Sequence, residues 1–491
     1  MRSALHRRMS VRVTGIVLAG AMLAATLAGT ATAQPADLAT TPAPDGVSDH
    51  VEFPQNYAVN AFEIRNRDYD RSYKKSTRAV KRAVRAEGGE ILRSYPKIGV
   101  VIAQAQDASF AEALRSEEYA DTVESLGATR TSATTTPDRR ADQYGVFQEP
   151  TIEPEPLEGD QWGNEALDSL EANEIQPGDP GVIVAVLDSG IDSTHEDLAE
   201  AVDTSLGADC TNNGILDTSA GAGEPTSSFH GTHVAGTIGA QRNGVGIAGI
   251  APGVTLASIK VVNADGYIFP EYAICGFMHA VKIDADITNN SYYIDPWLFW
   301  CPDDAEQGPV LESVQRMIEW THRKGGINVA AAGNADYDLA NKTTDSTSPN
   351  DGEVIPNRPV DGCFDMPTEL PGVVTVSATQ EDGAKSSFSN YGDGVIDVSA
   401  PGSAVLSTVW PGGGYGYASG TSMASPHAAG VAALALSQYP DLTPEELRTH
   451  IETTAVDVPC PEGSTECTGT PEYNGYFGHG LVNALNAVTE G

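Results

Sequence analysis

The stretch Val182-Ile183-Val184-Ala185-Val186-Leu187, followed by Asp188, decides the fold class. Its near-continuous run of aliphatic side chains, most of them β-branched, is typical of a strand buried on both faces of a parallel sheet. Similar runs alternate with helical patterns along the chain; the runs cover 255–262, 287–292, 327–332 and 373–378, and the helical patterns cover 230–240, 271–283, 309–323 and 422–437. This alternation predicts a doubly wound, mainly parallel α/β sheet, whose sites gather beyond the carboxyl ends of the strands.

Three polar residues stand where such a site should form. Asp188 follows the first strand, His230 opens a small-residue helix, and Ser422 lies where Gly420-Thr421 runs into another small-residue helix. A serine in the first turn of a helix lies beside unpaired backbone N–H groups, which can hold an oxyanion. Each residue alone has an ordinary explanation, because turn aspartates and N-cap serines are common. Together, a carboxylate, an imidazole and a hydroxyl in this order predict nucleophilic catalysis.

His233 lies one turn into the helix that His230 opens, so we expect it to face packed structure. Two histidines at this spacing could bind a metal ion. The zinc-peptidase pattern also needs a third ligand and a general-base glutamate between the histidines, and the sequence offers neither. We therefore expect no catalytic metal.

At all three motifs, in the order Asp, His, Ser, the chain resembles the subtilisin-like (subtilase) serine peptidases, over about residues 160–490. The resemblance implies that Asp188, His230 and Ser422 form a triad, with His230 as the base, and that no cofactor is required. It also implies that Asn334, after Ala332-Gly333, donates to the oxyanion. An amide that follows a strand and a glycine suits that role on physical grounds as well.

The resemblance further implies two segments that hold the substrate as an added strand. Ser291 and Tyr292 lie on one side, Gly266 and Tyr267 on the other, and Gly333 admits the substrate beside the oxyanion donor. The chain departs from the common family pattern at Tyr292-Tyr293, where many relatives carry leucine-glycine. Bulky side chains there could narrow the mouth of the site, so specificity is not carried over from relatives.

The segment 335–370 is long and contains Cys363. It could rim the cleft, tied to Cys301, or be a solvated insertion. Both interpretations stay open at the level of the sequence.

The first 33 residues have the pattern of a secretory signal peptide. Arginines precede an apolar run over 13–27, and Ala31-Thr32-Ala33 offers a cleavage site. We therefore expect a secreted, extracellular protein.

Residues 34–127 predict a small α+β, ferredoxin-like unit. Strand patterns cover 57–64, 90–104 and 122–126, and helical patterns cover 76–87 and 107–116. By position and element order the unit resembles the family's propeptide, which is a folding helper and intramolecular inhibitor. Its 76–87 helix is basic and could be a solvated face or could dock on the acidic domain that follows.

Residues 128–160 have the composition of an exposed, cleavable linker, and 161–491 form the expected peptidase domain. We expect maturation by cleavage between about Gly127 and Gln161, and the enzyme itself is one candidate for carrying it out.

The net charge of −38 is unevenly distributed. Residues 1–150 hold 19 Lys+Arg and 18 Asp+Glu, whereas the rest of the chain holds 10 and 49. Such an acidic surface disfavours nucleic acids and anionic membranes. We expect polypeptide substrates and the chain's own propeptide as partners, and a monomeric protein.

The six cysteines all follow residue 200: Cys210, Cys275, Cys301, Cys363, Cys460 and Cys467. An even number in an exported chain predicts up to three disulfides, whose pairing the sequence leaves open. Cys460 and Cys467 could close a short loop, whereas Cys275, in an apolar helical pattern, could be a buried thiol.

Asp197 and Asn243 match positions that help to hold a structural calcium ion in some relatives, and their oxygen atoms suit that ion. The resemblance therefore allows a structural calcium ion without requiring one.

The sequence thus predicts a secreted serine endopeptidase, made as an autoinhibited precursor, that works through an acyl-enzyme on Ser422. One alternative is a processing peptidase dedicated to a single precursor, which the crowded Tyr292-Tyr293 edge suggests. The other is a catalytically silent binding protein with the same fold, against which the intact set of motifs speaks.

Overall fold

The computed structural model describes residues 55–61, 69–106, 109–116, 123–129 and 157–490. The expected signal peptide and nearly all of the expected linker lie outside these residues. All described residues fall within one unit, Glu52–Gly491.

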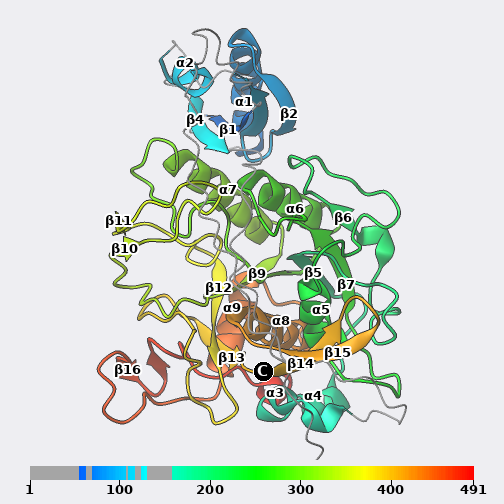
Figure 1. Ribbon diagram of the computed structural model, residues 1–491. Helices are drawn as coiled ribbons and strands as arrows, with labels where there is room; N and C mark the ends of the chain where they lie inside the picture. The colour runs from blue at the N-terminus through cyan, green and yellow to red at the C-terminus, as the bar shows by residue number, and fades with distance from the viewer. Residues whose placement is uncertain (1–54, 62–68, 107–108, 117–122, 130–156, 491) are drawn as a thin grey trace, which may run out of the picture. The chain divides into compact units, whose positions relative to one another are not determined.

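A seven-stranded sheet organises the larger part of the chain (Figure 1). Its spatial order is β13-β12-β9-β8-β5-β7-β6, and every neighbouring pair is parallel. The strands are β5 (Ile183–Asp188), β6 (Ala208–Asp209), β7 (Thr255–Lys260), β8 (Ile287–Asn290), β9 (Ile327–Ala331), β12 (Val373–Thr379) and β13 (Val398–Pro401). The order of the strands reverses between β5 and β8, which is where a doubly wound sheet forms its site.

Two hydrophobic cores cover the two faces of this sheet, and β5 contributes to both. Val184 and Val186 pack with α5 and α8, whereas Ala185 and Leu187 pack with α6 and α7. This double burial explains why the strand is apolar at successive positions. The helices are α5 (His230–Gly239), α6 (Pro270–Lys282), α7 (Gly308–Arg323), α8 (Thr421–Gln438), α9 (Pro444–Thr453) and α10 (Ala484–Thr489).

Shorter elements complete the domain. Two helices precede the sheet, and three hairpins extend from it: α3 (Trp162–Ala166), α4 (Ser169–Ile175), β10 (Thr344–Asp345) with β11 (Arg358–Pro359), β14 (Val405–Val409) with β15 (Gly414–Ala418), and β16 (Gly469–Thr470) with β17 (Tyr473–Asn474). Within the described ranges no helix is both long and apolar enough to cross a bilayer.

The predicted α/β alternation is confirmed, with three strands shorter than expected. The strand expected over 327–332 ends at Ala331. The strand expected over 287–292 ends at Asn290, because Ser291 leaves the sheet to bond with the start of α8. The strand expected over 255–262 ends at Lys260. Two strands of this sheet, β6 and β13, and the hairpin of β14 and β15 were not predicted from the sequence.

The expected α+β unit is also present, as a four-stranded antiparallel sheet in the order β2-β3-β1-β4. Its elements are β1 (Gln55–Ala61), α1 (Tyr69–Ala86), β2 (Glu90–Tyr95), β3 (Val100–Ala105), α2 (Phe110–Ser116) and β4 (Val123–Thr129). Val80, Phe110 and Leu114 fill the core between its helices and its sheet.

Polar contacts join this unit to α6 and the start of α7 through β1. Asn56 Nδ2 donates to Glu271 Oε1 (3.0 Å), and Asn60 Nδ2 donates to the Pro309 carbonyl (3.1 Å). Ser313 Oγ in turn donates to Asn60 Oδ1 (2.7 Å).

Three arginines of the basic helix face solvent. Arg78, Arg82 and Arg85 of α1 are exposed, which fits the solvated-face interpretation. The other interpretation, docking of the helix through its charges, gains no support from these three residues. The hydrogen bonds between this unit and helices α6 and α7 come from the buried side chains of Asn56 and Asn60 on β1.

Three disulfides use all six cysteines: Cys210–Cys275, Cys301–Cys363 and Cys460–Cys467. The expected short loop and the tie between Cys301 and the long segment are confirmed. The interpretation of Cys275 as a buried thiol is wrong, because the loop after β6 brings Cys210 against α6.

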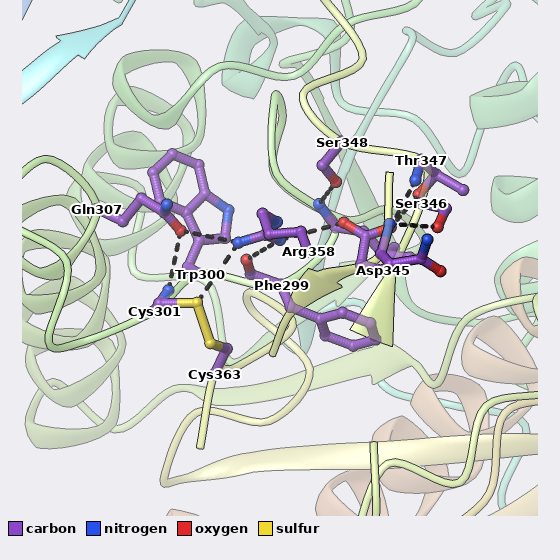
Figure 2. A network of polar contacts seen from close by, with 12 residues as sticks. Phe299, Trp300, Cys301, Gln307, Asp345, Ser346, Thr347, Ser348, Arg358 and Cys363 are labelled. Carbon is purple, nitrogen blue, oxygen red and sulfur yellow. Dashed lines mark hydrogen bonds and ion pairs between the residues drawn. A yellow bond between two sulfur atoms is a disulfide. The ribbon is translucent and has the colours of Figure 1, made fainter. Parts of the chain in front are cut away.

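The segment 335–370 is held by a buried polar network (Figure 2). The Arg358 guanidinium donates to Asp345 Oδ2 (3.1 Å) and to the Phe299 carbonyl (2.8 Å), and it reaches Gln307 Oε1 (3.4 Å) beside the disulfide. Burial raises the pKa of Asp345, but hydrogen bonds from Ser348, Thr347 and Arg358 outweigh it and hold that pKa below its ordinary value. The segment is therefore an anchored part of the domain.

We predict that Arg358→Met lowers the free energy of unfolding by about 3–5 kcal/mol, because it leaves a buried carboxylate without its cation. Denaturant unfolding followed by tryptophan fluorescence measures the loss. The double variant Arg358→Met/Asp345→Leu should recover part of it. Arg323→Met breaks an exposed ion pair with Glu319 and should cost far less. Equal losses in the two single variants would contradict the prediction.

Candidate active site

Asp188 and His230 meet at the carboxyl edge of the sheet. His230 Nδ1 lies 2.9 Å from each carboxylate oxygen of Asp188. The Ser189 N–H also donates to Asp188 Oδ1 (2.6 Å), so the buried carboxylate is fixed before it orients the imidazole. A carboxylate on Nδ1 favours the tautomer in which Nδ1 carries the hydrogen and Nε2 has the lone pair that can accept a proton.

A glycine allows this close approach of α5 to β5. A Cβ on Gly231 would lie 2.5 Å from the Gly190 carbonyl oxygen and 3.0 Å from Asp188 Oδ1. Any larger residue after His230 would therefore push the helix away from the strand.

Ser422 lies in the first turn of α8, against the end of β8. Its Oγ donates to the Ser291 carbonyl (3.3 Å), and Ser291 Oγ donates back to the Ser422 carbonyl (2.9 Å). One turn later, Ser425 Oγ donates to Asn289 Oδ1 (2.8 Å). These bonds fix the start of α8 to the strand next to the one that carries Asp188.

The side-chain amide of Asn334 is oriented by the residue before Ser422. Asn334 Oδ1 accepts hydrogen bonds from the Thr421 N–H (2.8 Å) and from Thr421 Oγ1 (2.9 Å). Because Oδ1 faces Thr421, Nδ2 points the other way, and the residue is exposed. Sequence reasoning missed Thr421, although its place beside Ser422 was a usable signal.

Gly333 needs its backbone conformation at this point. Its φ is +99°, and a Cβ would lie 2.3 Å from Asn390 Nδ2. Its N–H donates to Thr421 Oγ1 (3.0 Å), so Thr421 binds both Gly333 and Asn334.

A family model described as "Subtilase family" matches residues 179–480. The chain belongs to the subtilase family.

Relatives agree with this assignment. Subtilisin from Bacillus pumilus is 33% identical to this subtilase over 307 residues, which cover 62% of this chain and 90% of that protein. Subtilisin NAT from Bacillus subtilis subsp. natto is 32% identical over 307 residues, which cover 62% of this chain and 65% of its own length. The crystal structure of fervidolysin from Fervidobacterium pennivorans, described as a keratinolytic enzyme related to subtilisin, matches with a TM-score of 0.63 at 25% identity and covers 91% of this chain and 62% of that one. This subtilase thus spans just under two thirds of subtilisin NAT and of fervidolysin.

The residues expected to bind substrate lie on two separate segments. Gly266 is exposed with a φ of +90° and has nothing within 4 Å of a Cβ position. Tyr267 is half-buried, and its hydroxyl donates to the Asn350 carbonyl (3.2 Å). On the other side, the hydroxyl of Tyr292 donates to Asn290 Oδ1 (3.0 Å), and burial together with the charge of Asp188 raises the pKa of Tyr292.

The long segment joins these two sides, as the rim interpretation expects. Asn350 Nδ2 donates to the Tyr293 hydroxyl (2.9 Å) and to Asp295 Oδ1 (2.6 Å). Asp295 Oδ2 accepts from the Ile268 N–H (2.6 Å). Asp295 and Asn350 therefore set the spacing of the two edges, and neither was singled out from the sequence, because the contact depends on residues far apart in the chain.

His233 is fully buried, as expected. Its Nε2 lies 3.1 Å from the Val405 carbonyl and 3.2 Å from the Gly416 carbonyl, so Nε2 carries the hydrogen. Burial lowers its pKa to about 3, so it stays neutral and structural.

The calcium expectation falls on a buried carboxyl group. Asp197 Oδ2 accepts from the Ile247 N–H (2.9 Å), whereas Oδ1 has no partner among the described residues. Asn243 Oδ1 is engaged by the Val245 N–H (3.1 Å). The free oxygen of Asp197 suits a hard cation, but within the described ranges no three His, Cys, Asp or Glu side chains are grouped to hold a metal.

We predict a pH-dependent contribution of Asp295 to stability. Burial raises its pKa to about 7, although the Ile268 and Asn350 donors oppose this. The folded protein therefore holds this proton more tightly than the unfolded chain, whose aspartates have a pKa of about 3.9, so stability falls as pH rises through that window. Relative to wild type, Asp295→Asn should gain stability between pH 5 and pH 8 in thermal unfolding.

The exposed Asp303 provides a control for this prediction. Asp303→Asn should leave the difference from wild type independent of pH. If the difference in stability between wild type and Asp295→Asn is also independent of pH, Asp295 does not titrate in this window.

Proposed function

We propose that this subtilase is a secreted serine endopeptidase that hydrolyses polypeptides through an acyl-enzyme on Ser422. The observation that carries the proposal is the buried carboxylate of Asp188 on His230 Nδ1, at the sheet edge where α8 carries Ser422 in its first turn. The signal-peptide pattern and the disulfides support export.

The proposed reaction uses the groups of this edge in sequence. Ser422 Oγ attacks the carbonyl carbon of the scissile bond while His230 Nε2 takes the hydroxyl proton and then gives it to the leaving amine. Asp188 holds the imidazole and stabilises its charged form. The Ser422 N–H and Asn334 Nδ2 donate to the oxyanion of each tetrahedral intermediate. Water, deprotonated by His230, then releases the acyl group and restores Ser422.

The proposed substrate backbone lies between the two edges described above. Ser291 and Tyr292 border it on one side and Gly266 and Tyr267 on the other, so that it forms an added strand. Gly333 lets the attacked carbonyl come close to the oxyanion donor.

We further propose that the chain is made as a precursor. Residues 34–127 would act as an inhibitor-like propeptide, the linker 128–160 would contain the maturation site, and residues 161–491 would be the peptidase domain. The buried contacts of Asn56 and Asn60 with α6 and α7 support a specific, non-covalent association after cleavage.

A dedicated processing role remains the second candidate. The hydrogen bonds that Asn350 makes to both substrate edges favour it, because they restrict which peptides can enter. Cleavage of an unbiased peptide library distinguishes a single preferred sequence from broad hydrolysis.

The oxyanion assignment predicts that Asn334→Ala lowers kcat by about 10²–10³-fold with little change in KM, because the amide acts mainly in the transition state. Steady-state hydrolysis of a peptide amide measures this. Asn212→Ala, at another exposed asparagine, is the matched control and should keep wild-type kcat. Ser422→Ala should abolish both turnover and labelling by a serine-directed covalent inhibitor. If the inhibitor labels no residue in the wild-type protein, the catalytically silent alternative is favoured.

Maturation provides a separate prediction. If the enzyme cleaves its own linker, purified Ser422→Ala precursor should stay full length, whereas wild-type precursor gains a new amino terminus between Gly127 and Gln161. Intact-mass spectrometry of both proteins reads this directly. Trimming of the purified Ser422→Ala precursor at the same bond would show that another peptidase is responsible.

A further inference from the structure

Asp365 is a buried carboxylate that no neighbouring donor satisfies. Its side chain is 1% exposed, and Oδ1 has no hydrogen-bond partner among the described residues. Two other buried acids of the same region are satisfied: Asp345 is paired with Arg358, and Asp295 accepts from two N–H groups. Because an unpaired buried carboxylate is costly, its presence calls for a functional explanation.

Backbone hydrogen bonds on both sides hold Asp365 in place. The Phe364 N–H donates to the Trp300 carbonyl (2.8 Å), and the Ile294 N–H donates to the Met366 carbonyl (2.9 Å). Thr368 Oγ1 donates to the Ala331 carbonyl (2.8 Å), at the end of β9. The residue is thus fixed between the segment after Ser291 and the strand that leads to Asn334.

This position lies next to the proposed oxyanion site. Asp365 Oδ2 is 3.7 Å from where a Cβ on Gly333 would stand. Gly333 precedes Asn334 and binds Thr421, the neighbour of Ser422. A substrate residue whose carbonyl reaches Ser422 and Asn334 has its Cα one bond away from that carbonyl, so a long side chain from it can extend past Gly333 to the carboxylate.

Two buried acids, Asp365 and Glu369, have a single cation, Lys342, beside them. Glu369 is ion-paired with Lys342 (2.5 Å), and Lys342 Nζ also donates to the Leu339 carbonyl (2.8 Å). Glu369 accepts from the backbone N–H of Asp365 (2.6 Å), so the two acids are adjacent. Burial and the charge of Glu369 raise the pKa of Asp365, while Lys342 lowers it only in part. A second cation at Asp365 would complete the set of two acids and two bases.

We propose that Asp365 is a specificity-determining residue that binds the cationic side chain, arginine or lysine, of the substrate residue whose carbonyl Ser422 attacks. This inference rests on the proposed function and names its substrate class. The cation meets a carboxylate already desolvated and fixed, so the pair forms without reorganisation of the protein.

The test compares peptide amides that differ only at the residue before the scissile bond. Arginine and lysine are compared with norleucine, an uncharged side chain of similar length to lysine. For the wild-type enzyme, kcat/KM should be at least about tenfold higher for the two cationic peptides. Asp365→Asn should lower kcat/KM for those peptides by about 30-fold or more and leave the norleucine peptide nearly unchanged, because only the charge pair is lost.

Two further variants separate recognition from structure. Asp365→Glu keeps the charge and should keep the preference for cationic peptides. Asp361→Asn, at an exposed acid four residues earlier, should behave as wild type. Labelling of Ser422 by the serine-directed inhibitor counts the folded, competent sites in every sample, so loss of folding is not mistaken for loss of recognition.

The outcomes distinguish this inference from the function on which it rests. Labelling of Ser422 together with equal or faster cleavage of the norleucine peptide would overturn the role of Asp365 alone, as would an unchanged preference in Asp365→Asn. Absence of both labelling and cleavage would overturn the proposed function as well.

The mature amino terminus gives an independent readout. The basic residues within 128–160 are Arg130, Arg139 and Arg140. If the enzyme processes itself, the new terminus should be Thr131, Arg140 or Ala141. A self-generated terminus after any uncharged or acidic residue would contradict the inference.

Discussion

The junction between the start of α8 and the ends of β8 and β9 is the constraint on which the site depends. Reciprocal hydrogen bonds between Ser291 and Ser422 place the helix against one strand, and Thr421 fixes Asn334 after the next. The serine, its own backbone N–H and the amide donor are therefore positioned by one helical turn. Asp188 and His230 come from the neighbouring strand and from a helix on the same face of the sheet, so all the proposed catalytic groups are held by rigid elements.

The segment 335–370 is anchored onto this framework and positions two further side chains near the site. The Cys301–Cys363 disulfide and the Arg358–Asp345 pair anchor it. Once anchored, it brings Asn350 to both proposed substrate edges, and Asp365 close to Gly333. Restriction of entry and the proposed choice of a cationic side chain would thus both depend on one segment. The buried ion pair and the disulfide hold in place a segment that would otherwise be a surface loop, as these two roles would require.

Much of the framework was predictable because it depends on local patterns. Burial of a single element explains the β-branched run before Asp188 and the small-residue helices at His230 and Ser422. The observed bounds of these elements agree with the predicted ones to within a few residues. The predicted range of β8, 287–292, was two residues too long. The pattern of apolar residues does not reveal that Ser291 leaves the sheet to bond with the start of α8. The basic helix of the first unit could have been a solvated face or a docking surface, and the buried polar contacts come instead from Asn56 and Asn60 on β1.

The sequence by itself determined the fold class, because it follows from the pattern of each strand and helix. Through its resemblance to the subtilases it also indicated the candidate triad and the proposed oxyanion asparagine, whose residue types stand at a strand end or a helix start. Only the tertiary structure decided the pairing of the cysteines, the bridge from Asn350 to both edges, and the proximity of Asp365 to Gly333. These depend on distances between segments far apart in the chain, and an isolated aspartate in a long loop carries no local sign of what it faces. Its lack of a partner becomes visible only when all its neighbours are in place.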